Sequence, residues 1–423
     1  MNRIVLIGNG FDLAHGLKTS YADFINWYWK QWKRELILCH CSILEDPLCS
    51  IELDTEETDF TQWHGFLMQN IITYQQMSGT KFHEMLESSG LVIKKKSKLL
   101  TRICQSIKTK GWVDIEADYY DLLKECLKNN STIEVKELHK QFGYLQEKLI
   151  EYLLDIQTKS INKGIIDSTI RNKLLEAIKK EDIAVSSKDK WNDFYKSKTQ
   201  YNGKSRFSKL LTDYYEAHIP SEHDYLRTEF RDFSAIPQQE FPKSFYLPEN
   251  ILLLDFNYTS TTGHYLFTMP QRGRFSKINI HGTLDLPQSI IFGYGDEMDK
   301  HYQELEDLND NNYLAHIKSC KYLEASNYRK LLDFVESAPF QIYIMGHSCG
   351  NSDRTLLNTL FEHENCVSIK PFYYQKTDGT DNYREIAQNI SRNFKDKKLL
   401  RDRVVNKTYC EPMPQAKLAT DKN

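Results

Sequence analysis

The feature that most constrains the fold is a series of short apolar runs, each ending abruptly in a polar residue or a glycine. The clearest are Ile4–Ile7 before Gly8, Ile251–Phe256 before Asn257, Lys277–Ile280 before His281, Ile290–Phe292 before Gly293, Gln341–Met345 before Gly346, and the later run Val367–Tyr374. Such continuous runs are typical of strands buried on both faces of a parallel sheet. In open α/β sheets, ligands bind beyond the carboxyl ends of the strands, where these polar residues are expected.

The first run leads into the sequence Gly8-Asn9-Gly10-Phe11-Asp12, and a helix-compatible stretch begins near Thr19 and Ser20. Glycines let the backbone approach an anionic group closely, and a helix start offers unpaired N–H groups with a positive dipole end. The order of strand, glycine turn and helix therefore predicts a nucleotide-phosphate site. A tight turn in any α/β domain would give the same pattern.

Proline use divides the chain, because ten of the eleven prolines lie at Pro220 or later. We therefore predict a helical insertion over 36–244 within a discontinuous core of 1–35 and 245–405, followed by a flexible tail over 406–423. In the insertion, Ser131 and Glu134 form a capping box before an apolar stripe from Val135 to Tyr152. This stripe suits an internal seam or an oligomer interface equally. A second stripe covers Ile170, Leu174 and Ile178, and the polar stretch 186–205 is expected to be a loop.

Composition excludes several classes of protein. The 423 residues are 40% hydrophobic and 27% charged with a net charge of -3, which argues against a dedicated nucleic-acid binder. No apolar segment is long enough to span a bilayer, and the first strand leaves no room for a signal peptide, so we expect a cytoplasmic protein. Nine cysteines occur without a C-x-x-C pair, and the cluster Cys39, His40, Cys41 and Cys49 fits no common ligand spacing. We expect reduced thiols and no metal.

The segment Gly346-His347-Ser348-Cys349-Gly350 matches the nucleophile elbow of serine hydrolases. That mechanism needs a base histidine after the serine, and His363 would lie inside the next helix, from which it cannot return to Ser348. The alternative is that Gly346 and Ser348 contact a nucleotide while Ser352 or Asp353 caps the next helix.

The segment 112–118 contains Asp114, Glu116 and Asp118. A metal-dependent nuclease could use such carboxylates, although acids in the first turn of a helix also stabilise its dipole. A third reading is that Asp114 and Glu116 reach into the nucleotide pocket from the insertion.

Taken together, these motifs resemble the AbiH family of bacteriophage abortive-infection proteins. The resemblance rests on residues 8–12 with Gly16-Leu17-Lys18-Thr19-Ser20-Tyr21, on residues 112–116, on Phe256-Asn257-Tyr258, on His281-Gly282, and on Gly346-His347-Ser348 through Asp353. More distantly, the same order is similar to the Rossmann-like, sirtuin-like NAD-binding fold.

The sirtuin-like resemblance implies specific roles. Gly8 and Gly10 would hold the pyrophosphate, Asn257 would face the nicotinamide ribose, and His281 would act on a ribose hydroxyl. Asp12 stands where the sirtuin pattern has serine and Thr259 where it has aspartate, and the zinc module of deacylating sirtuins is absent, which argues against protein deacylation. Further expected contacts of the dinucleotide are Asn9, Phe11, Asp12, Tyr258, Gly346, Ser348 and Asp353, with Asp114 and Glu116 as accessory groups.

These resemblances predict an anti-phage NAD glycohydrolase with NAD as its substrate. Cleaving the N-glycosidic bond develops positive charge on the ribose while neutral nicotinamide departs, so no strong acid is needed. A neutral imidazole on a ribose hydroxyl and an orienting amide suffice, which assigns His281 and Asn257 as the catalytic pair. The alternative function is a sensor that binds a nucleotide without turnover and recruits a defence partner through the insertion.

Overall fold

The computed structural model describes residues 1–38, 43–52, 79, 92–128, 134–160, 166–199, 246–268 and 274–416. Its centre is a five-stranded parallel sheet with the order β6-β5-β1-β7-β8. The strands are β1 (Asn2–Ile7), β5 (Ile251–Asp255), β6 (Phe275–Asn279), β7 (Phe340–Met345) and β8 (Cys366–Phe372). The expected mixed α/β fold with a mostly parallel sheet is confirmed.

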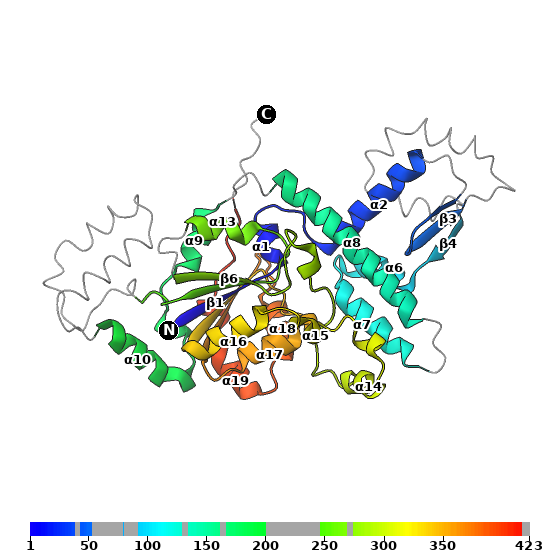
Figure 1. Cartoon of the computed structure of the whole chain (residues 1–423). Coiled ribbons are helices and arrows are strands. Elements are labelled where there is room, and N and C mark those ends of the chain that lie inside the picture. The colour runs from blue at the N-terminus through cyan, green and yellow to red at the C-terminus, as the bar shows by residue number, and fades with distance from the viewer. Residues whose placement is uncertain are drawn as a thin grey trace, which may run out of the picture.

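Alternation along the strands explains why both faces of this sheet are covered. In β1, Ile4 and Leu6 pack into one apolar cluster, while Val5 and Ile7 pack into another on the opposite face. The first cluster is covered by α16 (Asn327–Ser337), α17 (Arg354–Phe361) and α18 (Tyr383–Arg392). The second is covered by α1 (Asn9–Ala14), α9 (Ser168–Leu174) and α13 (Thr261–Thr268). The result is a three-layer core (Figure 1).

A second module stands beside this core. It contains the helices α2 (Tyr21–Leu38), α6 (Lys98–Lys110), α7 (Ile115–Cys126) and α8 (Val135–Ser160), and an antiparallel sheet of β2 (Ile43–Glu45), β3 (Cys49–Glu52) and β4 (Val92–Lys96). The α8 stripe packs inside this module, with Leu138, Phe142 and Leu145 buried in its core. The stripe is thus an internal seam.

The boundaries differ from the sequence expectation in three ways. A helix starts at Asn9, directly after the strand, and a second one, α2, starts at Tyr21 and packs with the module. The helix α9, which lies within the predicted insertion, packs on one face of the core sheet. The stretch 186–205 is not a loop throughout, because 188–199 forms α10 (Lys188–Thr199), which buries Trp191 and Phe194 against Met1 and Val367. Burial of these two aromatics outweighs the polar composition.

Other expectations concern shorter segments. Ile290–Phe292 is buried but forms no strand; Phe292 stacks on Phe142 of the module at 4.5 Å between ring centroids. The tail packs at least to residue 416, because Met413 is buried under the sheet and its amide donates to the carbonyl of Tyr373. The capping residue Ser131 and the cluster residues Cys39, His40 and Cys41 lie outside the described residues, whereas Cys49 is buried in β3.

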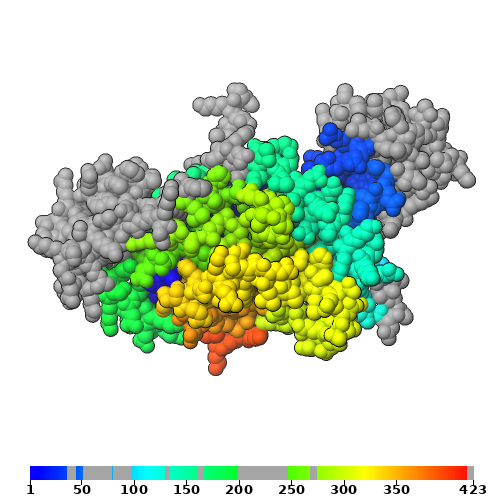
Figure 2. Space-filling model, viewed as in Figure 1, coloured from blue at the N-terminus to red at the C-terminus, as the bar shows by residue number. Residues whose placement is uncertain are grey.

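The segment 293–322 joins the core to the module. It includes α14 (Tyr302–Asp307) and α15 (Lys318–Tyr322) and lies beside the module, at the lower right of Figure 2 where yellow atoms meet turquoise ones. Tyr294 in this segment stacks on Tyr120 of α7, with ring centroids 4.0 Å apart. Within the described residues, no helix combines the length and apolarity that a membrane span requires.

Candidate functional site

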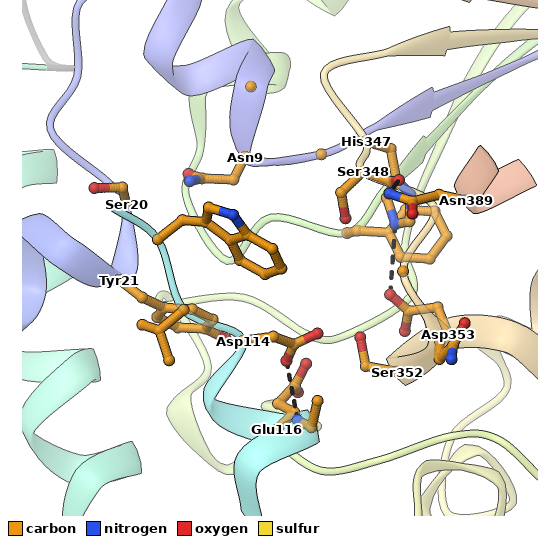
Figure 3. Close-up of a pocket in the computed structure, with 18 of the residues that line it drawn as sticks. Asn9, Ser20, Tyr21, Asp114, Glu116, His347, Ser348, Ser352, Asp353 and Asn389 are labelled. Atoms are coloured by element: carbon orange, nitrogen blue, oxygen red, sulfur yellow. Dashed lines mark hydrogen bonds and ion pairs between the residues drawn. The ribbon is translucent and has the colours of Figure 1, made fainter. Parts of the chain in front are cut away.

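A cavity of about 860 Å³ lies where the carboxyl ends of β1, β5 and β7 meet the module. The strand order reverses at β1, since β5 lies on one side of it and β7 on the other. Open α/β sheets bind ligands at such a reversal. In Figure 3, Asn9 and Ser348 lie on one side of the open space, and Asp114 and Glu116 at the start of α7 lie on the other. Core and module therefore each supply a wall.

The glycine turn after β1 is shaped by a neighbouring loop. A Cβ atom on Gly8 would lie 2.5 Å from the Cα of His347, and the Gly10 amide donates to the carbonyl of Gly346 at 2.8 Å. The glycines are thus required by the close approach of the loop after β7. Because its N–H group is already engaged, Gly10 can approach a phosphate only through other atoms.

Gly346 is the tightest point of this packing. Its φ is +79°, and a Cβ there would lie 2.1 Å from the amide nitrogen of Phe11. We expect Gly346→Ala to lower the free energy of unfolding by about 2 kcal/mol, because strain in the left-handed region adds to a backbone clash. Gly379→Ala is the matched control, since Gly379 has φ +83° with open space around it. Denaturant unfolding that showed equal losses for the two variants would refute the packing argument.

The tip of β5 reaches the same turn. The side-chain amide of Asn257 donates to the carbonyl of Gly8 at 3.1 Å, which ties β5 to the glycine turn and leaves a second N–H and the oxygen of the amide. Thr259 donates its hydroxyl to Oδ2 of Asp12 at 2.6 Å. Asp12 and Thr259 are the two positions at which the chain departs from the sirtuin pattern, and they form one carboxylate–hydroxyl pair.

Asp353 is the hub of a polar network on the cavity wall. Nε2 of His281 lies 3.2 Å from its Oδ1, and Nε2 of His347 lies 3.4 Å from its Oδ2. The amide of Cys349 donates to Nδ1 of His347 at 3.0 Å, so a neutral His347 carries its proton on Nε2, toward Asp353. His281 also contacts the hydroxyl of Tyr322 at 3.1 Å through Nε2. Both histidines are therefore oriented by internal partners.

Lys318 joins this hub to the module. Its side chain is fully buried, and its ammonium donates to Oδ1 of Asp353 at 2.8 Å and to Oε2 of Glu116 at 3.2 Å. Oε1 of Glu116 accepts the amide of Gly293 at 3.0 Å. One cation thus holds a carboxylate of the core and a carboxylate of α7 together.

Asp353 and Glu116, which share the Lys318 ammonium, have pKa values shifted in opposite directions. Burial alone would raise both, but Lys318 and His281 hold the pKa of Asp353 well below its usual range. Burial raises the pKa of Glu116 to about 8, against the opposing effect of Lys318. Burial, reinforced by Lys318, lowers the pKa of His281 to about 4, so its imidazole is neutral at pH 7. An ionised carboxylate and a neutral imidazole from the core, and a carboxyl group from the module that titrates near neutrality, therefore line one cavity.

The module contributes an aromatic and an acid at the cavity mouth. Trp112 is 54% exposed and lines the cavity just before α7. Asp114 caps that helix by accepting the amide of Ala117 at 3.0 Å, and burial raises its pKa. A flat apolar ring beside hydrogen-bond acceptors suits an aromatic heterocycle with polar substituents.

The sequence profile of the family described as bacteriophage abortive infection AbiH matches residues 4–375. The chain belongs to the AbiH family. No curated protein and no solved structure matches the chain significantly. The matched range of the AbiH chain includes both walls of the cavity except for the α18 side chains, among them Asn389 and Arg392. The family's defining function is phage abortive infection.

Most of the residues singled out from the sequence meet in this AbiH cavity. Those that line it are Gly8, Asn9, Gly10, Asp12, Asp114, Glu116, Asn257, Tyr258, His281, Gly346, Ser348 and Asp353. Phe11 does not belong to the lining, because its side chain is buried under the sheet against His15 and Tyr265. Asp118, the other acid of that segment, is also absent from the lining.

The serine-elbow hypothesis finds no support in the geometry. Ser348 is exposed, and the non-glycine residue of the loop with a left-handed conformation is the buried Cys349, with φ +55°. His363 contacts Glu336 and packs against Phe340, at the amino end of β7, whereas Ser348 follows its carboxyl end. A proton transfer from Ser348 to His363 is therefore excluded in this arrangement.

Sequence reasoning missed Lys318, His347, Tyr322 and Trp112. Lys318 resembles any other lysine of a polar helix, and Tyr322 any other tyrosine, because only the tertiary fold buries them. His347 lies inside the Gly346–Gly350 motif and Trp112 inside the segment 112–118, so both belong to motifs that the sequence already indicates. The motifs assigned roles instead to Gly346, Ser348, Asp114 and Glu116.

Proposed function

We propose that this AbiH chain binds NAD in the cavity and hydrolyses its N-glycosidic bond, releasing nicotinamide. The observation that carries the proposal is that the glycine turn, Asn257 and His281 line one cavity, although they come from three separate strand tips. Numbered along the chain, the sheet order is 3-2-1-4-5, the order of Rossmann dinucleotide-binding domains. This order favours a Rossmann-like assignment for the core.

The proposed chemistry uses the groups that line the cavity in the protonation states described above. A neutral His281 accepts or shares the proton of a ribose hydroxyl as positive charge develops on the sugar, and Asp353, which faces the Nε2 of His281, stabilises charge that forms on the ring. Asn257 orients the ribose or the attacking water with the amide groups that Gly8 leaves unused. Nicotinamide departs with the electron pair of the broken C–N bond, and the oxygen of the attacking water bonds to the anomeric carbon. The proton that this water loses passes to solvent, and the ribose hydroxyl recovers its own proton from His281.

Trp112 supports an aromatic ring of the ligand at the module wall by stacking, and Asp114 accepts hydrogen bonds from polar substituents of that ring. In a cell under phage attack, hydrolysis of NAD would arrest growth by removing a cofactor that most metabolism requires. This outcome agrees with the abortive-infection function of the family.

The test is to incubate purified protein with NAD and to follow nicotinamide release by chromatography. We expect turnover by the wild-type chain and a loss of about 10-fold or more in Asn257→Ala, because one orienting amide is removed. Asn312→Ala is the control, since Asn312 is exposed and does not line the cavity. Binding of NAD by calorimetry without release of nicotinamide would refute hydrolysis and favour the sensor function; no binding would refute both.

A further inference from the structure

Asp12 combines two properties that the network around Asp353 does not explain. Its side chain lines the cavity although the residue is only 1% exposed. Its Oδ2 accepts the hydroxyl of Thr259, while its Oδ1 is buried and has no hydrogen-bond partner among the described residues. A buried acceptor without a partner is costly, and such groups occur where a ligand completes the site.

We propose that Asp12 recognises a hydroxyl group of the bound sugar, with Oδ1 accepting the hydrogen bond and Thr259 as the positioning residue. This inference rests on the proposed function and deepens it, because it identifies the ligand as a ribosyl compound with a free hydroxyl at the glycine turn. The carboxyl group must be ionised to accept this hydrogen bond with its full strength.

Recognition of this kind makes binding depend on pH. Burial raises the pKa of Asp12 to about 7, against the hydrogen bond from Thr259. The charged groups that act on it are Asp255 at the end of β5, which raises the pKa, and Lys277 of β6, which lowers it. His15, on the same turn, is buried with its ring nitrogens on the Phe11 carbonyl and the Tyr265 hydroxyl.

The sign follows from linkage. A ligand hydroxyl that donates to the carboxylate stabilises the charged form, so binding lowers the pKa of Asp12 and releases a proton. Affinity therefore rises with pH through about 7 and levels off above it. His281 does not contribute in this range, because its pKa is about 4. Glu116 titrates near 8 but faces Lys318, and it is present in every variant below.

The experiment measures the dissociation constant of NAD by calorimetry between pH 5.5 and 8.5 in four chains that all carry His281→Ala, so that NAD is not consumed during the titration. The four are the otherwise wild-type chain, Asp12→Asn, Thr259→Val and Thr259→Ser. The pyrophosphate diester of NAD does not titrate in this range. We expect Asp12→Asn to bind about 10-fold or more weakly at pH 8 and to lose the rise in affinity near pH 7. Thr259→Val should move the midpoint of that rise upward by about one pH unit, because the carboxylate loses a donor, while Thr259→Ser keeps it.

These outcomes separate the two proposals. If the wild type binds NAD but Asp12→Asn shows the same affinity and the same pH dependence, Asp12 does not contact the ligand and only this inference fails. If Asp12→Asn is too unstable to purify, Thr259→Val and Thr259→Ser decide the matter, and identical midpoints overturn it. A wild-type chain that neither binds nor cleaves NAD overturns the proposed function itself.

Discussion

Replacing His281 with alanine is expected to lower the rate of nicotinamide release by about 10²- to 10⁴-fold, the usual contribution of a general base. The imidazole of His281 lines the cavity and is held by both Asp353 and Tyr322, so its loss removes a preorganised group. The effect should appear in kcat and to a lesser degree in KM, because the proton shift develops in the transition state. Stopped-time assays with saturating NAD measure it directly.

The controls address folding and pH. His301→Ala removes a partly exposed histidine that pairs with Glu304 outside the cavity and should leave turnover unchanged. His281→Gln retains a polar side chain that reaches the position of Nε2 and should remain as slow as the alanine variant. Because the pKa of His281 is about 4, kcat should stay flat as the pH falls from 7 to 5.5. Wild-type rates in His281→Ala would remove this residue from the mechanism.

Lys318→Met is expected to cost about 3–5 kcal/mol in the free energy of unfolding, which denaturant titration at pH 7 measures. The substitution keeps most of the side-chain volume but leaves the buried Asp353 and Glu116 without their shared cation. Breaking a buried ion pair on one side costs this much because a charge stays desolvated. Glu116, with a pKa of about 8, is already mostly protonated at pH 7. Lys318 is the main group that lowers the pKa of Asp353, so in the variant Asp353 can protonate as the pH falls to 5, and the difference from wild type should shrink.

A surface lysine gives the matched comparison. Lys407 also pairs with a carboxylate, Asp381, at 2.6 Å, but its side chain is 51% exposed. Solvent screening should limit the effect of Lys407→Met to about 1 kcal/mol or less. A loss of that small size in Lys318→Met as well would mean that the core and module are held together without this cation.

The sheet could be predicted because the apolar sequence of its strands indicates by itself that they are buried. β1, β5 and β7 are continuous apolar runs, and only a strand covered on both faces needs such a run. Ile290–Phe292 has the same pattern but forms no strand, because Ile290 and Phe292 pack into the apolar cluster of the module and Ile291 into that of the core, which no local signal distinguishes. The helix α10 was not predicted because its sequence is mostly polar, and only the fold shows that Trp191 and Phe194 are buried.

Many residues that line the cavity could be expected from the sequence, but the ion pairs among them could not. Strand tips mark the carboxyl edge of a parallel sheet, so the places of Asn257, His281 and Gly346 along the cavity could be expected from position, whereas the roles of Asn257 and His281 came from the family resemblance. The ion pairs were not, because a buried lysine has the same local sequence as an exposed one. Lys318 and Lys321 lie three residues apart, yet only the first is fully buried.

The central position of β1 also has a consequence for synthesis of the protein. Its two neighbours, β5 and β7, begin at residues 251 and 340, so the first strand leaves the ribosome long before either partner exists. At about 5–20 residues per second, the delay to β7 is roughly 15–70 s. During translation the nascent chain must keep an apolar strand from aggregating, and a pocket that needs the loop after β7 cannot form until most of the polypeptide has been made.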